Sequence, residues 1–169
     1  MLLFAASVGI ALAVSALCSL LEASLLSFPA SQVATLSMKR PAVGAIWQKF
    51  KTNIEKPIAV ILVLNTAAHT IGATLAGATF EKLFGAQWLF VFSLVFTYFM
   101  LQFTEILPKT IGVRYSGLMA PMIARPLDYM TRLLSPVLWF VHLVNRPFER
   151  GQSQGATSIE EITDRKSVV

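Results

Sequence analysis

Residues 88–112 read WLFVFSLVFTYFMLQFTEILPKTIG, an apolar stretch that carries one carboxylate, Glu105, near its end. A helix needs about 20 residues to cross a hydrocarbon core of about 30 Å. An ionisable group within such a segment marks a functional site by default. The stretch therefore predicts a transmembrane helix, and it makes Glu105 a candidate functional residue.

Two further stretches, from Leu2 to Phe28 and from Pro57 to Phe80, have the length and composition of membrane spans. Of the 169 residues, 55% are hydrophobic and 14% are charged, so a soluble fold would lack the polar residues to cover its surface. We predict an all-α membrane protein with three transmembrane helices. The first stretch reaches Pro29 without a signal-peptide cleavage site and is interpreted as a retained span.

The distribution of basic residues predicts the orientation of the chain. The basic residues between the first two spans are Lys39, Arg40, Lys49, Lys51 and Lys56, whereas the second and third spans are separated by Lys82 alone, beside Glu81. Short positively charged loops stay in the cytoplasm. We therefore expect the N-terminus outside and the C-terminal part in the cytoplasm. This bias accounts for the net charge of +5 without a nucleic-acid partner.

Segments 31–56 and 115–148 are amphipathic and are predicted to form helices at the headgroup level. Pro41 divides the first segment, and we expect Pro121, Pro126 and Pro136 to break the second into pieces too short to span. From Gly151 the composition is that of a linker, followed by a helix-opening pattern. Residues 151–169 are thus predicted to lead toward a further cytoplasmic domain.

Polar residues of all three spans are predicted to share one depth. Counted from the ends of their own spans, Ser24, Asn65 and Glu105 lie roughly 6 to 12 Å below the same interface. Ser27 lies three residues after Ser24, on the same face of the first helix. The sequence therefore predicts a cluster formed by Ser24, Ser27, Asn65 and Glu105.

Backbone carbonyls add to these ligands. Pro108 and Pro29 have no N–H group, so the carbonyls of Thr104 and Leu25 lose their α-helical donors. Hydroxyl, amide, carboxylate and carbonyl oxygens suit a hard cation such as magnesium, calcium or sodium. Glu22 is the other acid within a span, but it lies about 200° around the helix from Ser24, so an unbroken helix could not aim both at one ion.

Each polar residue also has a structural interpretation. Ser15 and Ser19 are read as packing residues, because serine in membrane helices commonly bonds to its own backbone or to a neighbouring helix. Asn65 could join two helices by a hydrogen bond, and His69 is read as a hydrogen-bonded structural residue. Glu105 could be protonated or paired with Lys109 one turn away.

Three segments resemble the signatures of the transmembrane domain of the CorC/CNNM family of magnesium transporters. They are Leu20–Ser27, Leu62–Thr66 and, most specifically, Thr104–Gly112. The resemblance implies a homodimer of three-span subunits with juxtamembrane helices, in a bacterial inner membrane. It implies export of Mg²⁺ proposed to be coupled to Na⁺ entry, with the cation site on Ser24, Ser27, Asn65 and Glu105. ATP would bind only to CBS domains, which we expect beyond residue 169.

These expectations describe a transporter rather than an enzyme. Mg²⁺ would enter from the cytoplasm, lose most of its water among these ligands and leave outward. A magnesium-sensing membrane scaffold without transport is an alternative that the sequence does not separate from a transporter. An intramembrane serine hydrolase, with Ser24 or Ser27 as nucleophile and His69 as base, is a third hypothesis. No oxyanion-hole loop is evident near either serine.

Overall fold

The structure, a computed structural model, describes residues 1–139, which are almost entirely helical. Residues 1–132 group into one compact unit, and all the contacts described below lie within it. The predicted linker 151–169 and residues 140–148 of the second amphipathic segment lie outside the described residues. The elements are α1 (Leu2–Ser27), α2 (Ala30–Lys39), α3 (Pro41–Thr52), α4 (Glu55–Phe84), η1 (Ala86–Trp88), α5 (Leu89–Met100), η2 (Leu101–Ile106), α6 (Leu107–Arg114) and α7 (Ser116–Leu133).

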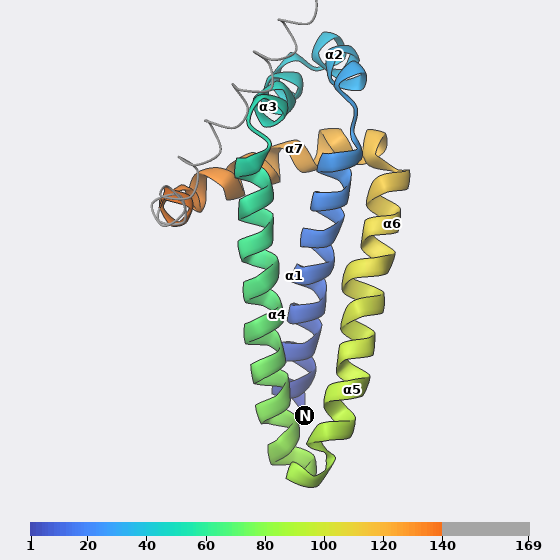
Figure 1. The fold of residues 1–169 in the computed structure, drawn as a ribbon, viewed down its shortest axis with the longest axis vertical. Helices are drawn as coiled ribbons and strands as arrows, with labels where there is room; N and C mark the ends of the chain where they lie inside the picture. Colours follow the sequence, from blue (N-terminus) through green and yellow to red (C-terminus); the bar gives the residue numbers. More distant parts are fainter. Residues whose placement is uncertain (140–169) are drawn as a thin grey trace, which may run out of the picture. The chain divides into compact units, whose positions relative to one another are not determined.

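Three long helical segments run side by side, with α1 between α4 and the α5–η2–α6 segment (Figure 1). Each is long and apolar enough to cross a membrane, over Phe4–Ser27, Glu55–Phe84 and Ala86–Arg114. The all-α fold with three membrane-spanning helices is therefore confirmed. The second helix begins two residues before the predicted span and ends four residues after it.

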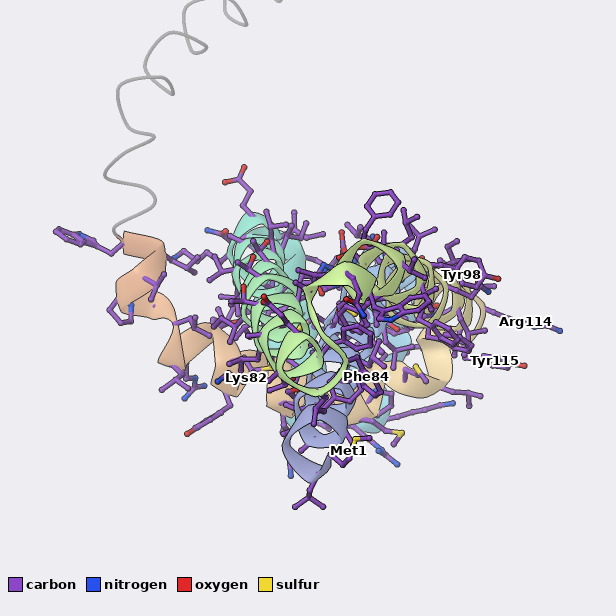
Figure 2. The ribbon with its side chains drawn as sticks, turned by 90° about the horizontal axis from the view of Figure 1, so that it is seen from below. Met1, Lys82, Phe84, Tyr98, Arg114 and Tyr115 are labelled. Atoms are coloured by element: carbon purple, nitrogen blue, oxygen red, sulfur yellow. The ribbon has the colours of Figure 1, made fainter. Side chains whose placement is uncertain are left out.

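The outer surface of these helices carries large apolar side chains. Ile10 of α1, Ile71 of α4 and Phe90 of α5 are all more than half exposed in the single chain. Figure 2, a view along the helices from the Met1 end, shows side chains radiating outward, among them Tyr98, which also lies on the surface. Such a surface is the one that a lipid bilayer covers.

The end of the bundle that carries Met1 is closed by aromatic rings. The ring of Phe80 in α4 stacks on Phe92 of α5 with centroids 4.2 Å apart, and Phe4 of α1 lies about 6 Å from both. The chain turns between α4 and η1 at Gly85, whose φ of +87° is readily adopted by glycine alone. This turn lies beside Lys82 and Phe84, which are labelled in Figure 2.

At the opposite end, α2 and α3 form a short pair and α7 crosses the ends of the long helices (Figure 1). Pro41 is the first residue of α3, so the predicted division at this proline is confirmed. Trp47 of α3 is fully buried, and its indole N–H donates to the carbonyl of Ala120 in α7 at 2.9 Å. The Trp47 ring also packs on Phe28, with centroids 4.7 Å apart. These contacts join α3 to α7 and to the end of α1.

The second amphipathic segment differs from its prediction. We expected Pro121 and Pro126 to break it, but both lie inside the continuous helix α7. Each proline removes one backbone hydrogen bond, to the carbonyls of Gly117 and Met122. Gly117 and Met122 are exposed, so other donors can reach these carbonyls, and the buried face of Ala120, Ile123, Ala124 and Leu127 holds the helix in place.

A lysine fills the gap in hydrogen bonding that the sequence indicates at Pro29. The ammonium of Lys51 in α3 donates to the carbonyl of Leu25 at 3.1 Å. Burial lowers the pKa of the Lys51 ammonium below its ordinary value. The Leu25 carbonyl is therefore occupied by a side chain of the protein rather than offered to an ion.

Candidate functional site

The third membrane helix changes its hydrogen-bonding pattern at the residues that carry its acid. Residues Leu101–Ile106 form one turn of π-helix, and the Leu107 N–H donates to the carbonyl of Gln102, five residues back. The Phe103 carbonyl thus loses Leu107, its α-helical donor, while its π-helical donor would be Pro108, which has no N–H. The π-turn therefore leaves the Phe103 carbonyl without a helical donor, next to the Thr104 carbonyl that the sequence indicates.

Glu105 lies in this π-turn, with its side chain about one-third exposed. The ammonium of Lys109 lies 3.8 Å from its carboxylate and 3.4 Å from the carboxylate of Glu22 in α1. The structural interpretation of Glu105 as a partner of Lys109 is thus realised. Two carboxylates share one ammonium, so this group carries one net negative charge when all three are ionised.

A cluster of polar side chains lies between the three long helices. The Ser15 hydroxyl of α1 donates to the side-chain carbonyl of Asn65 in α4 at 2.7 Å. The Nε2 atom of His69, one turn along α4, contacts Ser15 Oγ and lies 3.3 Å from Thr104 Oγ1 of η2. Thr104, beside Glu105, is fully buried and donates to the carbonyl of Met100 at 2.6 Å. One layer therefore gathers oxygen atoms from α1, α4 and η2.

Ser19 extends this layer by one turn of α1. It follows Ser15 by four residues and so lies on the same face of the helix. Its hydroxyl is fully buried, and among the described residues it has no hydrogen-bond partner. A hydroxyl without a partner is unfavourable in a medium without water. Ser19 is thus a free oxygen donor beside the cluster.

Ser24 and Ser27, the serines that the sequence predicts as ligands, do not contact the cluster around Ser15 and Asn65. The Ser24 hydroxyl is fully buried and donates to the carbonyl of Gly112 in α6 at 3.3 Å. Ser27 is the last residue of α1. Ser24 follows Ser15 by nine residues, which is about 13 Å along the helix, and Ser15 is the residue that contacts Asn65. The structure therefore brings Asn65 to Ser15 rather than to Ser24.

The close contact between α1 and α6 explains why Ser24 meets Gly112. A Cβ atom at Gly112 would lie 2.8 Å from the Leu20 carbonyl oxygen, 2.8 Å from the Ala23 Cβ and 3.2 Å from the Ser24 nitrogen. The absence of a side chain lets the two backbones approach, as small residues do in membrane helices. The α1–α6 contact lies nearer to α7 than the polar cluster does, at Leu20–Ser24 of α1.

Two sequence-based interpretations concern Ser15 and His69. Both were read as structural, and both form hydrogen bonds between helices. The hydrolase hypothesis needed a contact of His69 with Ser24 or Ser27, and in the described structure His69 contacts Ser15 and Thr104 instead. The positions of Ser15, Ser19 and Glu22, which share one stripe of α1, were the signal that could have pointed to this face.

The donors are mostly neutral oxygen atoms. Within residues 1–139, no three His, Cys, Asp or Glu side chains lie close enough together to hold a metal ion. The cluster offers hydroxyl and amide oxygens, the π-turn offers a freed carbonyl, and the Glu22 and Glu105 carboxylates meet at Lys109. These are ligands for a hard cation, not for zinc or copper.

Comparison with known proteins agrees with this architecture. Over 162 residues the chain is 33% identical to UPF0053 protein sll1254 of Synechocystis, covering 96% of this chain and 47% of that protein. It is 25% identical over 129 residues to the chloroplastic DUF21 domain-containing protein At1g55930 of Arabidopsis thaliana, covering 76% of this chain and 20% of that protein. The chain thus spans about half the length of the first relative and a fifth of the second. Residues 7–165 match the family described as the cyclin M transmembrane N-terminal domain, and the chain belongs to this CNNM family.

Proposed function

We propose that this chain is the membrane domain of a magnesium transporter that exports Mg²⁺ in exchange for entering Na⁺. The observation that carries the proposal is the layer of oxygen donors from α1, α4 and η2, whose η2 member Thr104 directly precedes Glu105 in the chain. Membership of the CNNM family supports the same function, because the resemblance of its signature segments is to magnesium transporters. The full protein, as in the family, would act as a homodimer with cytoplasmic domains that bind ATP.

The proposed ligands are Asn65 and Glu105, joined by two serines of α1. The geometry favours Ser15, which already contacts Asn65, and Ser19, whose buried hydroxyl is free. Ser24 and Ser27, the serines proposed from the sequence, are the competing pair. The freed Phe103 carbonyl adds an uncharged oxygen from the π-turn.

Charge balance gives Lys109 and Glu22 a part in this proposal. A divalent ion beside Glu105 alone would keep one positive charge in a medium of low dielectric constant, which is unfavourable. Glu22 and Glu105 now share the Lys109 ammonium. If Mg²⁺ displaces this ammonium, the two carboxylates match its charge. Magnesium also holds its water tightly, so a nearly octahedral set of oxygens at about 2.1 Å is needed to replace the water.

Isothermal titration of the purified chain with Mg²⁺ tests the binding step. Glu105→Gln and Asn65→Ala are each expected to lower the affinity about tenfold or more, since a hydrogen-bonding or ionic contact to a charged group contributes about 1.5–3 kcal/mol. Thr97→Val removes an exposed hydroxyl of α5 outside the cluster and is the matched control. Unchanged affinity in both site variants would refute the proposal.

The same titration separates the two serine pairs. Ser15→Ala with Ser19→Ala should weaken binding, whereas Ser24→Ala with Ser27→Ala should leave it close to that of the unmodified chain. The opposite result would return the site to the serines predicted from the sequence.

Transport needs a second experiment, because a magnesium-sensing scaffold would bind the ion equally well. Mg²⁺ efflux is measured from liposomes that contain the chain, with Na⁺ or choline outside. Efflux that depends on external Na⁺ and is lost in Glu105→Gln supports coupled export. Binding without efflux would favour the scaffold.

A further inference from the structure

A cavity with two lysines in its otherwise mostly apolar wall lies at the α7 end of the bundle, away from the proposed cation site. It has a volume of about 270 Å³ and is formed by α3, the α3–α4 link, the first turn of α4 and one residue of α7. The lining residues are Lys49, Phe50, Thr52, Asn53, Lys56, Pro57 and Thr131. Among the described residues two lysines and no acid line it, so these side chains give the cavity wall a charge of +2.

The wall is held in place by an ionic network behind it. The Asp128 carboxylate of α7 receives the Lys49 ammonium at 2.9 Å and the Arg132 guanidinium at 2.6 Å. Asp128 is buried, whereas more than half of the Lys49 side chain is exposed. Two cations on one carboxylate leave this network positive, so Asp128 positions Lys49 without cancelling the charge of the cavity.

Lys56 supplies the second positive charge, and among residues 1–139 it has no partner like the Asp128 carboxylate that holds Lys49. It is exposed, and in the described part of the chain it forms no ion pair. The exposed amide of Asn53 offers a further hydrogen-bond donor. The hydroxyl protons of Thr52 and Thr131 are donated to carbonyls of their own helices, so the ammonium and amide groups are the donors available to a ligand.

The position of the cavity indicates the source of its ligand. Lys56 is the second residue of α4, one of the three helices able to cross a membrane, so the cavity lies where a span meets the headgroup layer. Phe50 and Pro57 add an apolar wall to the basic one. Basic pockets at this level recognise phosphate groups of anionic lipids.

We propose that this cavity binds the phosphodiester headgroup of an anionic phospholipid, with Lys49, Lys56 and Asn53 as donors to the phosphate. A soluble phosphate has the same anionic oxygens, but it has no acyl chains to extend from the headgroup layer, where the cavity lies, into the bilayer. The site is separate from the magnesium ligands, so its test does not depend on transport.

The experiment measures the thermal unfolding midpoint of the full chain in a neutral detergent while dioctanoyl phosphatidylglycerol is added. We expect a saturable rise, with no such rise for dioctanoyl phosphatidylcholine or for inorganic phosphate. Lys56→Gln should raise the half-saturating lipid concentration about fivefold, which corresponds to about 1 kcal/mol for one lysine at an anionic surface. Lys56→Arg keeps the charge and should restore the affinity.

Lys82→Gln is the matched control, because it removes the same charge from the other end of α4. It should leave the half-saturating concentration unchanged. Equal effects of Lys56→Gln and Lys82→Gln would overturn the proposal, as would an equal rise with phosphatidylcholine. A saturable rise with inorganic phosphate that competes with the lipid would overturn the lipid assignment in favour of a soluble anion.

Discussion

Gly112→Ala is expected to separate α6 from α1 and to destabilise the bundle. The new methyl group would lie 2.8 Å from the Leu20 carbonyl oxygen and 3.2 Å from the Ser24 nitrogen. Both are backbone atoms of a helix, so they cannot turn aside as a flexible side chain would. Overpacking of this kind costs about 1–3 kcal/mol.

Two further effects set the net magnitude. Alanine is favoured over glycine in a helix by about 1 kcal/mol, which offsets part of the clash. Separating the helices also lengthens the Ser24–Gly112 hydrogen bond, which contributes about 1 kcal/mol. We therefore expect a net loss of about 1–3 kcal/mol in the free energy of unfolding.

The assay is denaturant-induced unfolding of the purified chain in detergent, followed by circular dichroism. Gly9→Ala is the control, because no atom lies within 4 Å of a Cβ added there, and it should be neutral or slightly stabilising. If Gly112→Ala proved as stable as Gly9→Ala, the close approach of α1 and α6 would be refuted.

Two other substitutions test contacts of the fold. Gly72→Ala should destabilise the α1–α4 contact because its methyl group would overlap the Ala11 side chain, and adding Ala11→Gly should restore stability in the same unfolding assay. At Asp128, burial favours the neutral acid, but hydrogen bonds from Lys49 and Arg132 hold the pKa below its ordinary value. The stabilisation is therefore complete at neutral pH and is lost as the pH falls through the lowered pKa, so Asp128→Asn should flatten the acid limb of a stability–pH curve. An acid limb that is unchanged in Asp128→Asn would show that other carboxylates determine it.

The spans follow from the sequence because their length and apolar composition depend on the bilayer alone. The depth of a polar residue within the bundle depends on where its helix ends and where the neighbouring helices cross it. These positions cannot be predicted from the sequence alone. Asn65 is the tenth residue after the start of α4, whereas Ser24 lies three residues before the end of α1. Counting from approximate ends thus placed two residues in one layer although they lie at different levels.

The sequence gives weaker signals for the π-turn and for the hydrogen-bond partners of Ser15 and Ser19. Pro108 indicates that a carbonyl loses its donor, but it does not by itself predict the five-residue hydrogen bond from Leu107 to Gln102, which also frees the Phe103 carbonyl. Ser15 and Ser19 have the spacing of a packing stripe and of a binding stripe alike. The structure adds that Asn65 lies across from Ser15, which the spacing alone does not predict.

The hydrogen bond from Lys51 to the Leu25 carbonyl makes two distant positions interdependent. The first helix ends at Ser27 and Phe28 is extended, so the Leu25 carbonyl lies in the last turn, where an α-helix supplies no donor of its own. A relative that lost the lysine would leave this acceptor at the end of its first span without a side-chain partner. A side-chain donor at position 51 is therefore expected among homologues, and an alignment would then reveal the joint between the interfacial helix and the first span.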